Sequence, residues 1–174
     1  WYKTHYLNQW CADDDLLIVR VNENTTIEQL PFRTQDYTYI LGVDLGYNDC
    51  SSFTVVAYHD YDKLAYIVES HKQGAMILTD VAKRIESLQS RFPFNKIKID
   101  GANKQGVEEM RSRFGIPFES ADKQGKSMFL KLLNDDISIG NVKIIRGACN
   151  GLLTEWNNLQ WSDLTKEKED PRCS

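Results

Sequence analysis

Long apolar runs are absent from this 174-residue sequence. None approaches the roughly 20 consecutive apolar residues that a membrane-spanning helix needs. The first ten residues also lack the basic segment followed by an apolar segment that marks a secretory signal. We therefore expect no membrane partner for this chain.

Paired cysteines and a large excess of basic charge are also missing. The four cysteines are far apart in the sequence, so none forms the Cys-x-x-Cys pair of zinc or redox sites. The net charge is −4, which argues against a protein that coats nucleic acid by bulk charge. A local basic groove, or a contact bridged by metal, is compatible with that charge.

The composition that is present belongs to a globular protein, with 41% hydrophobic and 26% charged residues. A chain of this length can build one domain with a substantial core, and is short for two. Residues 1–37 show no clean period, and we interpret them as an N-terminal arm that wraps the domain or links it to an upstream region. Residues 38–174 are then the domain itself.

From Thr38 onwards, strand and helix patterns alternate clearly. Three apolar or β-branched segments separated by short turns predict an antiparallel meander, and later segments alternate between helical spacing and short strands. This order predicts an α/β fold with a mixed sheet of five or slightly more strands and helices on both faces. The expected strands are 37–44, 51–60, 63–72, 95–100, 116–120 and 141–145, and the expected helices 75–92, 105–114, 126–136 and 150–161.

Two acidic residues, Asp44 and Asp100, each close a strand that is otherwise apolar. If these strands are parallel neighbours, both carboxylates lie at the edge of the sheet where open α/β folds bind ligands. Adjacent carboxylates repel unless a cation holds them, and Mg²⁺ or Mn²⁺ prefers oxygen ligands. We predict a site for two such ions, with Asp44 bridging them and Asp100 binding one. Asp49 is a weaker candidate ligand.

Each aspartate also has a simpler interpretation, because an aspartate at the end of a strand often only forms a turn or caps a helix. Asp49 in particular suits a turn. Gly42 and Gly46 flank Asp44 at alternate positions, where they would allow the backbone to bend and a phosphate to approach closely. The pair of carboxylates on neighbouring strands is what favours the catalytic interpretation.

The order of these motifs resembles the nuclease domain of phage large terminases, over roughly Tyr39 to Trp161. Gly42, Asp44 and Gly46 match the family's Gly-x-Asp-x-Gly strand end, and Asp100 matches the aspartate that closes a later strand. Further matches are a following glycine, a lysine-bearing helix start and a short strand after "ISIG", carried by Gly106, Lys123, Lys126 and 141–145.

This resemblance implies a ribonuclease H-like fold and a divalent-metal-dependent endodeoxyribonuclease that uses two Mg²⁺ or Mn²⁺ ions. It would cut concatemeric double-stranded DNA during genome packaging in the host bacterial cytoplasm. The implied partners are double-stranded DNA, an ATPase domain upstream of residues 1–37 in the same full-length chain, the portal and the small terminase subunit.

The family's third metal-binding acid has no clear match in this sequence. Asp163 and Asp170 are local candidates, but neither falls in a convincing helical pattern, and Asp170 precedes Pro171. We therefore expect the third acid beyond Ser174, with the nuclease domain truncated at its C-terminal end.

Basic residues are concentrated between Lys96 and Lys131, where eight stand against five acidic residues in a chain of negative net charge. This local excess fits a track for the DNA backbone. We expect phosphate contacts from Lys104, Lys123 and Lys126, whereas Arg111 and Arg113 fit solvated helix faces.

Three other functions are compatible with parts of the sequence. One is another ribonuclease H-like nuclease, of the junction resolvase or transposase type. Another is a fragment of an actin-like or sugar-kinase-like ATPase, because "GVDLGYND" also resembles that family's first phosphate loop, although the second such loop is missing. The last is a non-catalytic binding or assembly module in which Asp44 and Asp100 are structural.

Overall fold

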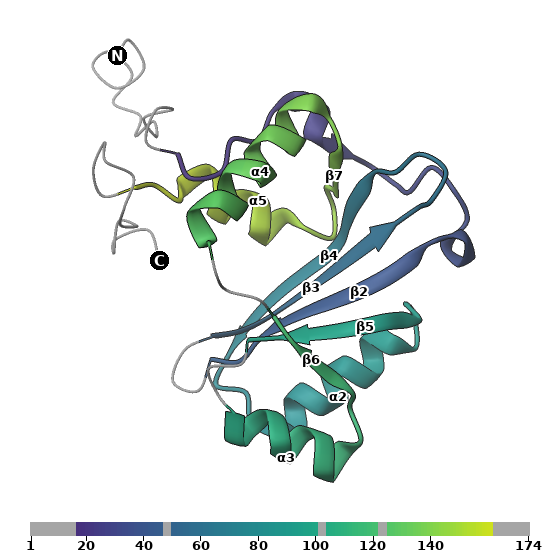
Figure 1. Cartoon of the computed structure of the whole chain (residues 1–174), viewed down its shortest axis with the longest axis vertical. Coiled ribbons are helices and arrows are strands. Elements are labelled where there is room, and N and C mark those ends of the chain that lie inside the picture. The colour runs from purple at the N-terminus through teal and green to yellow at the C-terminus, as the bar shows by residue number, and fades with distance from the viewer. Residues whose placement is uncertain (1–16, 47–49, 101–103, 122–124, 162–174) are drawn as a thin grey trace.

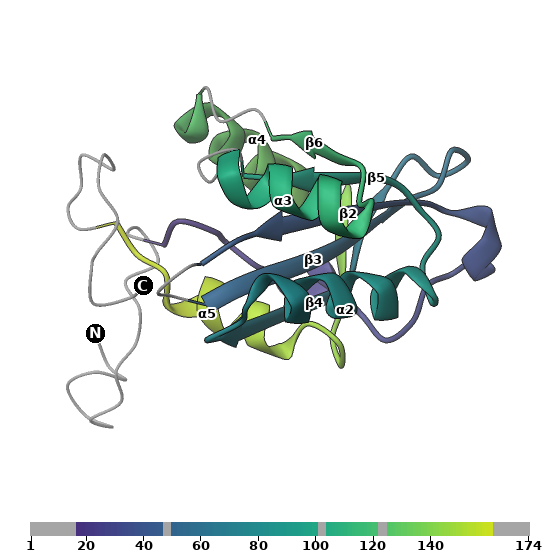
Figure 2. The same ribbon diagram turned by 90° about the horizontal axis from the view of Figure 1, so that it is seen from below.

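A computed structural model describes residues 17–46, 50–100, 104–121 and 125–161. The described strands form one seven-stranded sheet in the order β1-β7-β4-β3-β2-β5-β6. Helices α2 and α3 lie on one side of the sheet, and α4 and α5 lie on the other (Figures 1 and 2). The mixed sheet with helices on both faces is the architecture that the sequence predicts. The predicted sheet has five or slightly more strands, and the described sheet has seven.

The centre of the sheet is an antiparallel meander of β2 (Thr38–Asp44), β3 (Cys50–Tyr58) and β4 (Ala65–Gly74). Buried and less buried residues alternate along β2 and β3, as expected for strands that pack one face against helices. On β2 the buried residues are Tyr39, Leu41 and Val43. The three predicted strands are confirmed, with ends that differ by at most two residues.

Strands β5 (Phe94–Ile99) and β6 (Phe118–Ser120) extend the sheet beyond β2, each parallel to its neighbour. Parallel strands need a crossover, and α2 (Leu78–Gln89) and α3 (Lys104–Phe114) provide it on one face. A proline follows α2 at position 93, and Gly115, with φ of +66°, follows α3.

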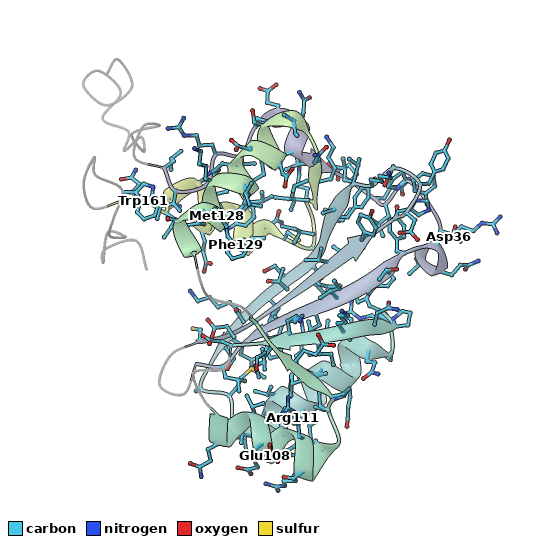
Figure 3. The ribbon with its side chains drawn as sticks, viewed as in Figure 1. Asp36, Glu108, Arg111, Met128, Phe129 and Trp161 are labelled. Carbon is cyan, nitrogen blue, oxygen red and sulfur yellow. The ribbon has the colours of Figure 1, made fainter. Side chains whose placement is uncertain are left out.

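The opposite edge of the sheet is built from both ends of the described chain. Helix α4 (Lys126–Ile139), β7 (Val142–Ile145) and α5 (Asn150–Asn158) follow one another, and β1 (Thr26–Ile27) pairs with β7. Two 3₁₀ turns, at Glu23–Thr25 and Thr34–Asp36, flank β1 on the way to β2. Met128 and Phe129 lie exposed on α4 (Figure 3).

Two hydrophobic cores lie on the two faces of the sheet. The larger packs β2, β3 and β5 against α2 and α3, with the side chains of Leu41, Phe53 and Ile85 at its centre. The smaller packs β7 and Ile67 of β4 against α4 and α5. Ile18 and Val19 are buried in this smaller core, so the described part of the 1–37 segment packs onto the domain. Its link to an upstream region stays a prediction.

Candidate active site

The structure brings Asp44 and Asp100 together at the carboxyl ends of two neighbouring strands, β2 and β5. Strand β2 runs parallel to β5 with Val43 beside Ile99, and the backbone N–H of Asp100 donates to the carbonyl oxygen of Val43 over 3.3 Å. Neighbouring strands are about 4.8 Å apart. The sequence prediction that these two strands are parallel neighbours is therefore confirmed.

Both aspartates belong to the sheet face that points away from α2 and α3. Val43 and Ile99 are buried in the larger core, and successive residues of a strand point to opposite faces. Asp44 is exposed and Asp100 half-buried. The two carboxylates therefore share a face that solvent reaches.

A polar row continues across this face from Asp44, and the sequence analysis missed it. Asp44 is paired with Ser52 on β3, and Ser52 is paired with Lys72 on β4. Cross-strand partners share a face, so these side chains stand on the carboxylate face. The Nζ of Lys72 lies 3.0 Å from Oε1 of Glu155 on α5. Lys72 thus brings a positive charge to the same face.

The remaining sequence-predicted site residues are only partly described. Helix α3 begins at Lys104 and α4 begins at Lys126, so both lysines start helices as expected, although their side chains lie outside what the structure describes. Lys123 and Asp49 lie outside the described residues, as do Asp163 and Asp170. The roles of all these residues stay predictions.

Several basic residues near the site already have acidic partners. The Nζ of Lys98 lies 2.7 Å from Oε2 of Glu119, and hydrogen bonding from Lys98 lowers the pKa of Glu119. On α3, Arg111 pairs with Glu108 and Arg113 with Glu109. Figure 3 shows Arg111 and Glu108 on this helix, away from α4. The pair of Arg113 fits the predicted solvated face of α3, whereas Arg111 also donates from Nη2 to the carbonyl oxygen of Phe118 on β6 and so ties the helix to the sheet.

The carboxylate pair suits a divalent cation, but it is not a complete cage. Within the described ranges, no group of three or more His, Cys, Asp and Glu side chains could hold a metal. Asp44 and Asp100 offer oxygen atoms of the kind that Mg²⁺ and Mn²⁺ prefer, on an accessible face. The two residues fit a metal as part of a ligand set.

The sheet order, the crossovers and the paired carboxylates at the ends of β2 and β5 define a ribonuclease H-like fold. No family model matches the chain. No helix in the described part is long and apolar enough to cross a membrane.

Solved structures of phage large terminases share this fold. The nuclease domain of the bacteriophage SPP1 large terminase with bound Mn superposes with a TM-score of 0.67 at 15% identity, covering 91% of each chain. The P22 large terminase nuclease domain gives 0.67 at 15% identity, covering 89% of this chain and 84% of that one. A large terminase from a thermophilic bacteriophage, in complex with ATP-gamma-S, gives 0.73 at 11% identity, covering 89% and 41%.

A curated sequence gives the same result. The large terminase subunit of Escherichia phage T5 is 24% identical over 137 residues, which is 76% of this chain and 31% of that protein. The chain thus spans about a third of that relative's length. The resemblance to terminase nuclease domains is confirmed, and at these identities the superpositions establish the fold.

Proposed function

We propose that this chain is the divalent-metal-dependent endonuclease domain of a DNA-packaging terminase, cutting concatemeric double-stranded DNA. The observation that carries the proposal is the placement of Asp44 and Asp100 at the ends of adjacent parallel strands, on one accessible face. The shared fold with terminase nuclease domains supports it.

Asp44 and Asp100 would hold the metal ions in this proposal, with Asp49 as a further candidate and a third acid supplied beyond Ser174. When bound, two divalent ions would lower the pKa of a water nucleophile and stabilise the leaving 3′-oxygen. The relative from SPP1 was solved with bound Mn, which supports a divalent ion of this type. The protein's own contribution is to hold the two carboxylates at a fixed spacing, through the register of β2 and β5.

The DNA backbone would lie over the carboxylate face. Lys104 and Lys126, where α3 and α4 begin, and Lys123 would contact phosphates on one side. Lys72 stands on the same face as Asp44, through Ser52, and would contact the backbone on the other side. Lysine contacts to phosphate position the duplex without reading its sequence, which suits cutting with little sequence preference.

The further partners are proposed from the relatives. The large terminase from a thermophilic bacteriophage, of which this chain matches 41%, was solved with ATP-gamma-S. An ATPase domain upstream of residues 1–37 in the full-length chain would therefore accompany this domain. The portal, the small terminase subunit and the host bacterial cytoplasm complete the proposed setting.

Plasmid cleavage in Mn²⁺, Mg²⁺ or EDTA tests the proposal. The 174-residue chain, its Asp44→Ala variant and a chain extended beyond Ser174 would be compared. We expect cutting that needs metal and Asp44 and that increases with the extension. If no version cuts, and metal stabilises none of them against heat, the two aspartates are structural and only the fold is shared.

The substrate range separates terminase from other ribonuclease H-like nucleases. Linear duplex, four-way junction and RNA–DNA hybrid would be offered to the extended chain under the same conditions. Preferential cutting of the junction would indicate a resolvase, and cutting of linear duplex without sequence preference would support the terminase assignment.

A further inference from the structure

Helix α4 is apolar on both of its sides. Toward the sheet, Leu130, Leu133 and Ile137 pack in the smaller core. The outer side carries four large apolar side chains that are between 48% and 71% exposed, namely Met128, Phe129, Leu132 and Ile139. We call these four residues the outer stripe of α4. A helix that is apolar all round is normally buried all round, so the outer stripe calls for an occupant.

The outer stripe is a continuous line. Met128, Leu132 and Ile139 are four and then seven residues apart, which places them one above the other along the helix, with Phe129 beside them. At a rise of 1.5 Å per residue the line is about 16 Å long. An extended segment of about five residues has the same length, so a short stretch of chain could cover it.

The described part of the N-terminal arm runs along α4. Nδ2 of Asn22 donates to the carbonyl oxygen of Ile137 over 3.4 Å. Oδ1 of Asn134 accepts from the backbone N–H of Arg20 over 2.9 Å, and its Nδ2 donates to the carbonyl oxygen of Ile18 over 2.8 Å. Traced backwards from Asn22 to Ile18, the arm therefore advances toward the N-terminal half of α4, which carries most of the outer stripe.

The arm is held from both sides up to Leu17, where the described chain begins. Leu17 forms an antiparallel bridge with Gln160, and the backbone N–H of Ile18 donates to the carbonyl oxygen of Leu159 over 3.0 Å. Figure 1 shows this start of the described chain beside α4 and α5. Residues 1–16 are therefore joined to the domain next to α4.

Residues 1–16 also have a composition that suits the outer stripe. The first ten contain five large apolar or aromatic side chains and no acidic residue: Trp1, Tyr2, Tyr6, Leu7 and Trp10. Aromatic side chains bury large areas and dominate the energetics of interfaces. In extended form, sixteen residues reach about 50 Å, which exceeds the roughly 21 Å length of the 14-residue helix.

Charge supports the same path. Residues 13–15, between these aromatic residues and Leu17, are all aspartates. Lys131 is exposed and, by the helical period, stands on the surface of α4 between Asn134, which holds the arm, and Met128 of the outer stripe. A chain that leaves Asn134 for the outer stripe would thus carry its acidic run past a lysine, where opposite charges attract.

We propose that residues 1–16 of the same chain cover the outer stripe of α4, with their aromatic side chains against Met128, Phe129 and Leu132. The other conceivable occupants are a second copy of this chain and a separate protein. The proposal goes beyond the proposed function and does not depend on it, because it involves neither the carboxylates nor DNA.

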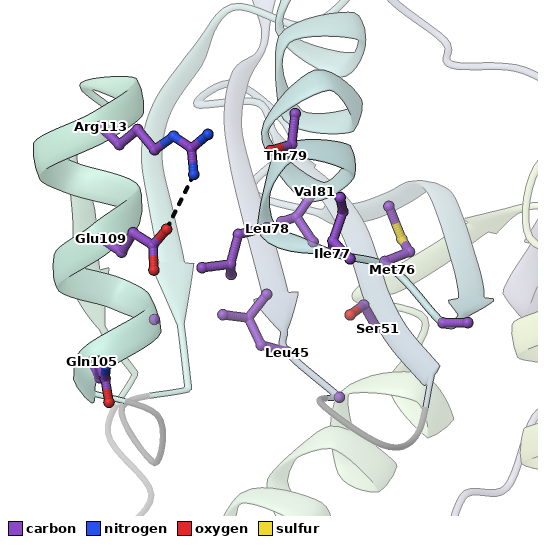
Figure 4. A pocket seen from close by; sticks show the side chains of 13 residues that line it. Leu45, Ser51, Met76, Ile77, Leu78, Thr79, Val81, Gln105, Glu109 and Arg113 are labelled. Carbon is purple, nitrogen blue, oxygen red and sulfur yellow. Dashed lines mark hydrogen bonds and ion pairs between the residues drawn. The ribbon is translucent and has the colours of Figure 1, made fainter.

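The three methionines of the chain allow a direct test by NMR of methyl groups labelled with ¹³C. Met128 reports on the outer stripe, Met76 on the cavity between α2 and α3 (Figure 4), and Met110 on the larger core. Trp10→Ser should shift the Met128 signal, because a neighbouring ring displaces a methyl signal, and should leave the other two unchanged. Tyr61→Ser, which removes an exposed ring elsewhere, is the control and should shift none of the three. A Met128 signal that Trp10→Ser does not move would overturn the proposal.

Cross-linking separates the possible occupants. In a chain with Cys50 and Cys173 replaced by serine, a short bismaleimide should join Cys11 to the new thiol of Leu132→Cys within one molecule. Ile77→Cys offers a similarly exposed position at the start of α2, on the other face of the sheet, and should not be joined. Products that link two chains only would identify a second copy as the occupant. That result, no product at position 132, or equal yields at positions 132 and 77 would contradict the proposal.

Discussion

The two ends of the central strands are built from different side chains. At the end where β2 begins, aromatic rings contact one another: Phe32 stacks on His59 with ring centroids 4.1 Å apart, and Tyr37 meets Tyr66 at 5.5 Å. The hydroxyl of Tyr66 donates to Asp62 over 2.5 Å, and the hydroxyl of Tyr37 accepts from the backbone N–H of Phe32. At this end, which we call the aromatic end, the buried hydroxyls of Tyr37 and Tyr66 are both hydrogen-bonded.

The opposite end, which we call the carboxylate end, has a different character. Asp44 and Asp100 close neighbouring strands on an accessible face, and a cavity lined by Leu45 and Ser51 lies on the other side of the sheet. Negative charge is therefore concentrated where β2 and β5 end, without a complete set of ligands in the described chain.

The difference shows how one sheet combines stability with a charged site. Ring packing and half-buried hydrogen bonds at the aromatic end stabilise the pairing of β2, β3 and β4. A fixed register then holds the carboxylates side by side at the far end, where their mutual repulsion opposes close approach. Stability and function should therefore separate when each end is mutated in turn.

The largest expected effect comes from exchanging one aspartate at each end for asparagine. Asp44→Asn should reduce metal-dependent cleavage about a thousandfold, since removing a metal ligand costs several kcal/mol of transition-state stabilisation. Its free energy of unfolding should hardly change, because Asp44 is exposed. Asp62→Asn should do the reverse, keeping cleavage but losing about 1–2 kcal/mol of stability, because its single amide oxygen cannot accept from both the Tyr66 hydroxyl and the backbone N–H of Leu64.

Plasmid cleavage and urea unfolding of both variants would check this pair. A stable Asp44→Asn protein that cuts at the wild-type rate would contradict the catalytic role of the carboxylate end. A fall in cleavage for Asp62→Asn, measured where that protein is fully folded, would show that the two ends are coupled.

The next effect concerns stability alone. Tyr66 is only 2% exposed and packs in the larger core, so Tyr66→Ala should lower the free energy of unfolding by about 3–5 kcal/mol. Tyr61 lies at the same end but is 85% exposed, and Tyr61→Ala should stay within about 0.5 kcal/mol of wild type. Urea unfolding compares the two. Equal losses would mean that the aromatic end is stabilised by its exposed rings rather than by burial.

High pH should weaken the aromatic end. Burial, the hydrogen bond with Asp62 and the nearby charge of Asp62 raise the pKa of Tyr66 far above its ordinary value of 10. Above pH 10 the unfolded tyrosine loses its proton while the folded one keeps it. Each such group then lowers stability by about 1.4 kcal/mol per pH unit.

Unfolding of wild type and Tyr66→Phe between pH 9 and 11.5 would measure this effect. The variant should be less stable below pH 10 but should lose less stability above it. Tyr61→Phe is the exposed control at the same end. Parallel curves for wild type and Tyr66→Phe would mean that the Tyr66 hydroxyl ionises alike in both states.

Most of the strands and helices could be predicted from the sequence, because the residue patterns that define them are local. Alternation of buried residues defines β2 and β3, the spacing of Val81, Ile85 and Leu88 defines α2, and the parallel pairing of β2 with β5 follows from the helical crossover. Asp44 and Asp100 stand out because carboxylates interrupt apolar runs. Strand β1 was missed, since its two residues carry no period of their own.

The polar row of Asp44, Ser52 and Lys72 could not be predicted, because it depends on a β-bulge that the sequence does not reveal. The register of β3 and β4 shifts between Val55 and Val56, which leaves Val68 of β4 without a partner on β3. Counting outward from the turn without that shift would place His71, not Lys72, opposite Ser52. One extra residue exchanges the two faces of a strand. The cavity around Ser51 likewise depends on how two distant helices approach the sheet.

The smallest predicted effect tests whether that row contacts DNA. Lys72→Gln should weaken DNA binding severalfold and reduce the slope of log affinity against log salt by about one, as for the loss of one phosphate contact. Its exposed ion pair with Glu155 should contribute at most about 1 kcal/mol to stability. Lys63→Gln, a lysine at the aromatic end, is the matched control and should change neither. Fluorescence anisotropy with a short DNA duplex at several salt concentrations would measure both slopes, and equal slopes for Lys72→Gln and wild type would place the DNA away from β4.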